Sequence, residues 1–169
     1  MNIIIHDLTK ELFEELFSPV NRDTKIISNT GHIQNCIGCF GCWVKTPGKC
    51  VIKDGYENMG VLLSQADHVI IISRCYYGGY SPFVKNILDR SISYLLPFFR
   101  IKHGETHHKQ RYQNKFRLSV YFYGSHITPE ERKTARKLVQ ANRINFHVPE
   151  SQVFFFPSVN QLSREVKLQ

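Results

Sequence analysis

The chain has 169 residues, of which 42% are hydrophobic, and a formal net charge of +8 at pH 7. This length suffices for one domain with a sizeable core, so we expect a single domain spanning residues 1–169. No apolar run reaches the ~20 residues that a membrane-spanning helix needs, and the first residues lack the features of a secretory signal peptide. We therefore expect a cytoplasmic protein without a membrane partner.

The positive charge is unevenly distributed along the chain. Residues 1–99 contain nine Lys/Arg and nine Asp/Glu, whereas residues 100–169 contain thirteen and five. The excess falls mainly in a basic loop, Arg100–Lys115, and in a helix with Arg132, Lys133, Arg136 and Lys137. A nucleic-acid-binding protein would also present a recognition helix or an aromatic sheet, and the sequence has neither pattern. We expect no nucleic-acid partner, and interpret the charge as a solvated face or an attractor for dinucleotide phosphates.

The N-terminal part of the chain alternates between strand and helix patterns. Asn2–His6 is a short apolar, β-branched run, which predicts a buried strand. Leu8–Phe17 has apolar residues at helical spacing and is followed by Pro19, so a short helix is expected there. Lys25–Ser28 returns to strand character and leads into a loop rich in cysteine and glycine.

Four of the five cysteines lie within fifteen residues of this loop. Cys36, Cys39 and Cys42 are separated by two residues each, and Cys50 follows after seven more. A compact loop with glycines at its bends can turn four thiolates toward one point. Two-residue gaps are typical of bacterial iron–sulfur sites, whereas a zinc ribbon separates two Cys-x-x-Cys pairs by a longer spacer. Three alternatives stay open: an iron–sulfur cluster, a zinc site, or a metal-free loop at a subunit contact.

A helix and the strongest strand of the sequence follow the cysteine loop. Asp54 is placed to be the N-cap of a helix over Gly55–Gln65. His68–Ser73 is too uniformly apolar for an exposed sheet, which indicates a central parallel strand. This strand leads into the turn Tyr76–Gly79, with the sequence Tyr-Tyr-Gly-Gly. Such a turn after a central strand favours a ligand platform over core packing, because pockets form at that place.

The next helix has clear signals for its start and its end. Ser81 is the expected cap, Pro82 takes the first helical position, and Pro97 is expected to end the helix. The basic loop that follows contains His107 and His108, for which we expect exposure to solvent and no metal site. Three charged residues of the helix predict a structural ion pair or a subunit contact: Lys85, Asp89 and Arg90.

The last part of the chain completes an alternating pattern. Phe116–Tyr123 and Gln152–Phe156 are expected strands, Thr128 opens a helix with a capping box, and the last thirteen residues leave room for a closing helix. Five strands that alternate with helices predict an α/β fold with a parallel sheet covered on both faces. Ligands of such sheets bind at the carboxyl ends of the strands. The expected ligand-binding loops are 6–9, 29–54, 73–81 and 123–128.

Four segments carry a resemblance to a known family: Cys36–Asp54, Ala66–Ile71, Tyr76–Ser81 and Lys85–Arg90. Together they resemble the flavodoxin-like NADPH-dependent FMN reductase family, and most of all its iron–sulfur flavoprotein branch. The resemblance follows the element order over about residues 1–156. It implies a flavodoxin-like three-layer sandwich with a five-stranded parallel sheet of order 2-1-3-4-5.

The resemblance also implies cofactors and site residues. FMN would lie at the carboxyl edge of the sheet, with NADPH or NADH as co-substrate and a small molecule or a redox protein as electron acceptor. Carried over by position, the ring would be contacted by Tyr76, Tyr77, Gly78 and Gly79, and on its other side by Gly124 and Ser125. The ligands of a [4Fe–4S] cluster would be Cys36, Cys39, Cys42 and Cys50. We expect no catalytic acid or base, because the cofactor carries the chemistry, and we expect a homodimer or homotetramer.

The first loop departs from the family pattern. The family has a Gly/Ser-rich segment there, which wraps the FMN phosphate with backbone N–H groups. This chain has His6–Lys10 instead, with no glycine and one hydroxyl. Asp7 would repel the phosphate unless Thr9, Lys10 or Arg74 compensates, so Thr9 and Arg74 are the expected cofactor-binding residues in this region.

The leading hypothesis is an FMN-dependent oxidoreductase, either an NAD(P)H-dependent flavin reductase or an electron-transfer protein of the iron–sulfur flavoprotein type. The unusual first loop motivates an alternative, a non-catalytic flavodoxin-like binding module. A third hypothesis is a metal- or redox-sensing protein built on the cysteine loop.

Overall fold

The main sheet of the protein has five parallel strands in the order β2-β1-β3-β6-β7. The structure is a computed structural model that describes residues 1–102 and 104–166. His103 of the predicted basic loop and the end of the predicted closing helix lie outside the described residues. Because β6 and β7 are the fourth and fifth strands of this sheet, the predicted order 2-1-3-4-5 is confirmed. The strands are β1 (Asn2–His6), β2 (Thr24–Ile27), β3 (His68–Arg74), β6 (Arg117–Tyr123) and β7 (Ser151–Phe156).

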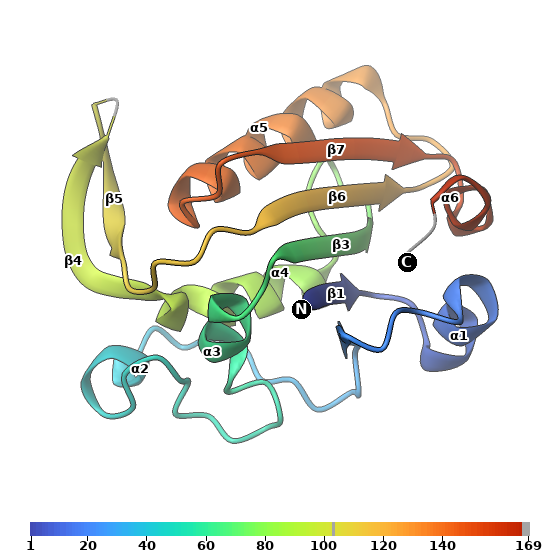
Figure 1. Cartoon of the computed structure of the whole chain (residues 1–169). Helices are drawn as coiled ribbons and strands as arrows, with labels where there is room; N and C mark the ends of the chain where they lie inside the picture. The colour runs from blue at the N-terminus through green and yellow to red at the C-terminus, as the bar shows by residue number, and fades with distance from the viewer. Residues whose placement is uncertain (103, 167–169) are drawn as a thin grey trace.

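Helices cover both faces of this sheet, as Figure 1 shows. Alternate residues of a strand point to opposite faces, so each strand contributes to two hydrophobic layers. Ile4 and Ile70 pack with α1 and α6 on one face, whereas Ile3 and Ile71 pack with α3, α4 and α5 on the other. This arrangement is the flavodoxin-like three-layer sandwich. The helices are α1 (Lys10–Phe17), α3 (Met59–Ser64), α4 (Pro82–Arg90), α5 (Pro129–Asn145) and α6 (Val159–Glu165).

Of the two helix caps predicted at Thr128 and Asp54, the structure contains only the first. The capping box of α5 is confirmed: Thr128 Oγ1 accepts a hydrogen bond from the Glu131 N–H at 3.2 Å, and the Glu131 carboxylate accepts one from the Thr128 N–H at 2.8 Å. Asp54 was predicted to cap a helix over Gly55–Gln65. This prediction is wrong, because the helix at that place, α3, begins only at Met59. The carboxylate of Asp54 binds the guanidinium of Arg90 instead, and a buried cation is a stronger partner than a helix N-terminus.

A β-hairpin replaces the predicted basic loop. After α4 the chain forms a short 3₁₀ helix, η1 (Ser91–Tyr94), and then the antiparallel strands β4 (Leu95–Lys102) and β5 (Glu105–Gln110), which make a separate two-stranded sheet. The hairpin stands at the left of Figure 1. The prediction of a loop was wrong, and Pro97 lies inside β4 instead of ending a helix. Polar side chains dominate β5, so its sequence carries no apolar alternation that indicates a strand.

Two regions of the molecule contain the predicted site residues. The carboxyl ends of β1, β3 and β6 meet at one edge, near α1 and α6 in Figure 1. From this edge α4 runs back toward the hairpin and the cysteine loop, which contains the short helix α2 (Gly41–Val44). None of the helices in the described residues is both long and apolar enough to cross a membrane.

Candidate functional site

The carboxyl edge of the sheet is organised around Asp7, which directly follows β1. Its Oδ2 accepts a hydrogen bond from the Arg74 backbone N–H at 2.8 Å, and its Oδ1 accepts one from the Tyr123 hydroxyl at 3.0 Å. The ends of β1, β3 and β6 are therefore tied together through one carboxylate. Burial raises the pKa of Asp7, and burial together with the Asp7 carboxylate raises the pKa of Tyr123. The first loop thus holds an internal anion where a phosphate-binding loop presents N–H groups.

The other polar residues of the first loop are engaged within α1. Thr9 is the N-cap, and its Oγ1 accepts a hydrogen bond from the Leu12 N–H at 3.2 Å. The Lys10 ammonium lies 3.9 Å from the carboxylate of Glu14. Glu11 adds a negative charge to the first turn of the same helix. Thr9 and Lys10, the two residues of this loop that were predicted to compensate for Asp7, therefore each contact a group within α1.

The loop after β3 is a tight turn that presents aromatic side chains. Tyr76 and Gly79 exchange two backbone hydrogen bonds, of 3.0 and 2.7 Å. Tyr77 and Gly78 have positive φ angles of 51° and 79°, and a Cβ at Gly78 would lie 2.7 Å from the carbonyl oxygen of Glu131 in α5. The turn is therefore held closely against α5. Tyr77 is 90% exposed and Tyr76 is 43% exposed, so both rings are accessible to a ligand.

Arg74 and the loop after β6 complete this edge. The Arg74 guanidinium carbon lies 5.4 Å from the centre of the Tyr76 ring, a cation–π contact. The Gly124 N–H donates to the Phe156 carbonyl at 3.0 Å, and Ser125 is exposed. All the predicted cofactor-binding residues thus lie at the end of β1, β3 or β6 or in the loop that follows, at one edge of the sheet: Thr9, Arg74, Tyr76, Tyr77, Gly78, Gly79, Gly124 and Ser125.

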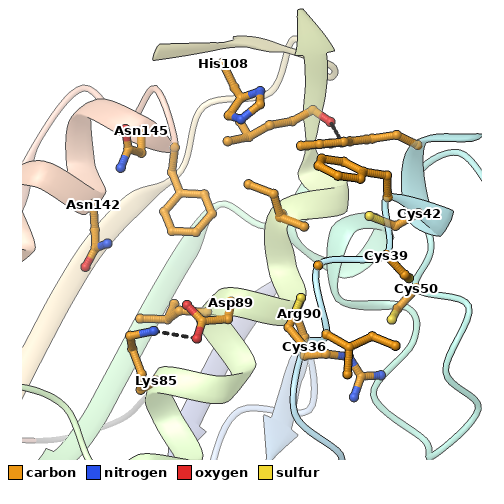
Figure 2. Close-up of a pocket in the computed structure, with 18 of the residues that line it drawn as sticks. Cys36, Cys39, Cys42, Cys50, Lys85, Asp89, Arg90, His108, Asn142 and Asn145 are labelled. Atoms are coloured by element: carbon orange, nitrogen blue, oxygen red, sulfur yellow. Dashed lines mark hydrogen bonds and ion pairs between the residues drawn. The ribbon is translucent and has the colours of Figure 1, made fainter. Parts of the chain in front are cut away.

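A cavity of about 530 Å³ lies in the other region, between α4, α5, β5 and the cysteine loop. Figure 2 shows the cysteines on one side of it and the ion pair between Lys85 and Asp89 on another, which confirms a structural ion pair on α4. Apolar side chains such as Leu138 and Phe146 contribute to its wall. None of the eight predicted flavin-contacting residues lines this cavity, so the two predicted sites are separate. All four predicted metal ligands line it: Cys36, Cys39, Cys42 and Cys50.

The four thiols line the same cavity but differ in exposure. Cys36 and Cys39 are exposed, Cys42 is half-buried and Cys50 is buried. Burial raises the pKa of Cys42, and the neighbouring thiols raise it further, because a second thiolate charge nearby is unfavourable. Within residues 1–102 and 104–166, however, no three Cys, His, Asp or Glu side chains come together in a group that could hold a metal ion. The metal-ligand assignment therefore stays a prediction.

A buried ion pair fastens both ends of the cysteine loop to α4. Arg90 Nη1 donates to Asp54 Oδ2 at 2.7 Å and Nη2 donates to Asp54 Oδ1 at 2.9 Å, with the two side chains 0% and 3% exposed. Arg90 Nη1 also donates to the carbonyl of Gln34, which precedes the first cysteine, at 2.8 Å. The guanidinium lowers the pKa of Asp54 to about 2. Arg90 is therefore a structural clamp of the cysteine site.

The sequence predicted a structural ion pair for Arg90, which is confirmed, but not its partner Asp54 or its contact with the cysteine loop. Arg90 lies three residues after Ile87 and seven after Phe83, on the apolar face of α4. A charge on the buried face of an amphipathic helix requires a buried partner. The spacing indicates that such a partner exists, but it does not identify Asp54.

The histidines of β5 belong to the cavity wall. His107 is 9% exposed, and its Nδ1 lies 2.9 Å from Asn145 Oδ1 in α5. The His108 ring lies 4.9 Å from the Trp43 ring, and Trp43 Nε1 donates to the Leu95 carbonyl at 3.0 Å. The prediction that both histidines face solvent was wrong, because the hairpin places β5 against α5 and the cysteine loop.

Solved structures with a similar fold include three azoreductases. An azoreductase from Bacillus anthracis str. Sterne has a TM-score of 0.56 and 9% identity, covering 97% of this chain and 89% of the other. Azoreductase AzrA gives 0.54 and 10%, covering 97% and 90%. An FMN-dependent NADH-azoreductase from Bacillus anthracis str. Ames Ancestor, in complex with FMN, gives 0.53 and 11%, covering 97% and 93%. At such low identity these likenesses show a shared fold alone.

Comparison of the sequence with known proteins gives information beyond the fold. An iron-sulfur flavoprotein of Methanocaldococcus jannaschii is 41% identical over 56 residues, which are 33% of this chain and 28% of the relative. An iron-sulfur flavoprotein of Archaeoglobus fulgidus is 27% identical over 107 residues, which are 63% of this chain and 42% of the relative. The chain thus matches less than half the length of either relative. The sequence model of one family, described as NADPH-dependent FMN reductase, matches residues 6–160. Since this match covers most of the chain, the chain belongs to the NADPH-dependent FMN reductase family.

Proposed function

We propose that this chain is a flavin-dependent oxidoreductase, which takes electrons from NADPH or NADH and passes them to a small molecule or a redox protein. Membership in the NADPH-dependent FMN reductase family supports this activity. The observation that carries the proposal is the Tyr76–Gly79 turn. It presents two accessible aromatic rings at the carboxyl end of the central strand β3, where ligands of parallel sheets bind.

The residues at this edge fit the ring of a flavin better than its phosphate. Tyr76 and Tyr77 offer aromatic faces for an isoalloxazine ring, and Ser125 offers an exposed hydroxyl from the loop after β6. A bound flavin would supply hydride acceptance and electron transfer. The chain's own contribution is to bind and orient the ring, and no side chain is required as an acid or base. Asp7 does not fit a phosphate dianion, because its carboxylate carries the same sign of charge.

Flavin titration tests this proposal. Purified protein is titrated with FMN and, separately, with riboflavin, and the change in flavin absorbance near ~450 nm is followed, since the cofactor does the chemistry. Tyr77→Ser is expected to weaken binding about threefold to tenfold, because one aromatic stacking contact is lost. Phe98→Ser is the matched control, since Phe98 is 62% exposed but lies in β4. Failure of the wild type to bind either flavin would contradict the proposal.

The alternative function is a non-catalytic flavodoxin-like binding module. The unfavourable first loop around Asp7 is the observation that favours it. A module of this kind would neither bind flavin nor oxidise NADPH. Flavin binding together with flavin-dependent NADPH oxidation by the wild type would remove this alternative.

We propose further that the four loop cysteines are redox-active or metal-binding ligands, with a [4Fe–4S] cluster as the group to test. Their position around one cavity and the names of the two sequence relatives support this assignment. As they stand the thiols do not form a metal site, so no step of the proposed reaction depends on a cluster. Anaerobic reconstitution is expected to bind about four irons and four sulfides per chain, and Cys39→Ser to reduce both, whereas Cys75→Ser is the control. Reconstituted protein without iron would contradict the cluster.

We also propose a homodimer or homotetramer in a reducing compartment such as the cytoplasm. The described cysteines are all free thiols, which a reducing environment maintains. Large exposed apolar side chains gather on the cysteine loop and on β4, two segments that the Trp43 hydrogen bond joins. Such a set marks an interaction surface. Its members are Ile37, Phe40, Val44, Phe98, Phe99 and Ile101, which are 60% to 78% exposed.

A further inference from the structure

We propose that Asp7 makes the flavin site of this chain select riboflavin over FMN, that is, a flavin whose side chain ends in an uncharged hydroxyl over one that ends in a phosphate. The inference rests on the proposed function, in which the flavin ring lies on the Tyr76–Gly79 turn. A ring in that place would extend its side chain toward the first loop, because the two lie next to each other at the ends of adjacent strands, β1 and β3.

The carboxylate of Asp7 is fixed in place by hydrogen bonds from two other segments, the end of β3 and the end of β6. Its two oxygens accept hydrogen bonds from the Arg74 backbone N–H at 2.8 Å and from the Tyr123 hydroxyl at 3.0 Å. The hydroxyl of Ser81 faces the same carboxylate; this side chain is buried and makes no close hydrogen bond to a described residue. Rotating Asp7 away from a phosphate would leave the Arg74 N–H and the Tyr123 hydroxyl without their acceptor. The negative charge therefore stays at the end of β1.

Nearby positive charges do not neutralise this carboxylate. Asp7 forms no ion pair with a Lys, Arg or His among the residues that the structure describes. The Arg74 side chain turns toward the Tyr76 ring, and Lys10 lies near Glu14. A phosphate carries close to two negative charges at pH 7, so the Asp7 carboxylate would repel it.

An uncharged side-chain terminus suits the same surroundings. Two ionised carboxylate oxygens offer about four acceptor sites, of which the observed hydrogen bonds use two. The terminal hydroxyl of riboflavin can donate to a remaining site, and a hydrogen bond to a charged acceptor is a strong one. Asp7 thus repels one flavin and offers an acceptor to the other, which is how specificity between close relatives arises.

Dissociation constants of riboflavin and FMN, measured by quenching of flavin fluorescence, test this inference. For the wild type we expect riboflavin to bind about tenfold more tightly than FMN, because the fixed charge of Asp7 repels the phosphate of FMN but not the hydroxyl of riboflavin. Asp7→Asn keeps the shape of the side chain and an acceptor for the Arg74 N–H while removing the charge. It is expected to tighten FMN binding about tenfold and to leave riboflavin binding unchanged or weaker. Glu15→Gln is the matched control, since it removes one exposed charge from α1 and should leave the ratio within about twofold.

The possible outcomes separate this inference from the proposed function. Equal or tighter binding of FMN by the wild type overturns the inference and leaves the flavin enzyme intact. A ratio that Asp7→Asn does not change, in a variant whose circular dichroism matches the wild type, overturns the role of Asp7. Absence of binding of both flavins to both proteins overturns the proposed function and the inference together. The wild-type ratio needs no variant, so a poorly folded Asp7→Asn would not leave the question open.

Discussion

Arg90 and Asp54 illustrate how single charged residues shape the cysteine site. They lie 36 residues apart in the chain and form a bidentate ion pair that is almost completely buried. Taking two charges out of water is costly, so such a pair adds little net stability compared with apolar residues of the same shape. Its larger contribution is to the geometry of the site, because Arg90 binds both Asp54 and the Gln34 carbonyl and so joins the two ends of the cysteine loop to α4.

Removing one member of this buried pair should therefore lower the free energy of unfolding much more than removing one member of an exposed ion pair. Arg90→Met is expected to lower the free energy of unfolding by about 3–5 kcal/mol, because Asp54 is left as a buried, uncompensated charge. The control is Lys85→Met on the same helix, which breaks an ion pair whose side chains are 58% and 46% exposed. It should cost about 0.5 kcal/mol or less. Urea unfolding followed by circular dichroism measures both; similar losses in the two variants would contradict the structural role of Arg90.

His6, at the end of β1, predicts a pH dependence of stability. The side chain is 1% exposed and stacks on Phe13 at 4.1 Å, and burial lowers its pKa from 6.5 to about 4. Between these two values the unfolded chain binds a proton that the folded chain does not. Stability from this residue is therefore complete above pH 6.5 and is lost as the pH falls toward 4.

The expected slope is about 1.4 kcal/mol per pH unit within that window. His6→Phe keeps an aromatic ring on Phe13 but removes the titrating group. The difference in the free energy of unfolding between wild type and His6→Phe should thus change steadily between pH 6.5 and 4, measured by urea unfolding at a series of pH values. A difference that is constant over this range would show that His6 titrates normally in the folded state.

At the scale of elements, the turn after β3 is constrained by its neighbour α5. Gly78 has a φ of 79°, and its α-carbon faces the carbonyl oxygen of Glu131 so closely that a Cβ would lie 2.7 Å from it. An L-residue at this place meets both backbone strain and a steric overlap with a helix backbone. The turn can present Tyr77 to a ligand only because glycine allows this close approach.

Gly78→Ala should accordingly shift the turn and weaken flavin binding. We expect a loss of about 2–4 kcal/mol in the free energy of unfolding, from strain and overlap together. Gly31→Ala is the matched control, since Gly31 has a φ of 81° but open space around it. It should cost about 1–2 kcal/mol and leave flavin binding unchanged. Equal effects of the two variants on stability and on flavin affinity would contradict the packing of the turn on α5.

For the whole molecule, α4 connects the two candidate sites. Its N-terminus at Ser81 lies next to Asp7 at the flavin edge, and its C-terminus at Arg90 lies under the cysteine loop. With nine residues it spans roughly 13 Å. The predicted flavin site and the cysteine-lined cavity are thus held at the two ends of one rigid helix.

Assembly is the prediction that belongs to this scale. Ile101→Asp places a charge in the exposed apolar set on β4 and is expected to convert the proposed oligomer into a monomer, because a desolvated charge at an interface core is unfavourable. Ile26→Asp, at a 37% exposed position of β2, is the control and should keep the wild-type mass. Light scattering after size-exclusion chromatography measures the mass. A monomeric wild type would rule the proposed assembly out.

Local patterns in the sequence determined the five strands of the main sheet, most helices and the shared edge of the candidate flavin residues. The apolar runs at β1 and β3 and the capping box at Thr128 act through contacts close in the chain, so they can be recognised without the fold. Parallel strands end at one edge, which is why residues after β1, β3 and β6 could be grouped in advance. The spacing of the cysteines in one loop was equally visible.

Only the tertiary structure decided the rest, because it depends on contacts between distant segments. The partner of Arg90, the tie from Asp7 to Tyr123, and the burial of His107 against α5 each join residues at least 36 positions apart. The polar strand β5 acquires its place from packing against α5 and the cysteine loop, not from a pattern of its own. Sequence periodicity reports which face of an element is apolar, whereas the pairing of individual charged groups is set by how those faces meet.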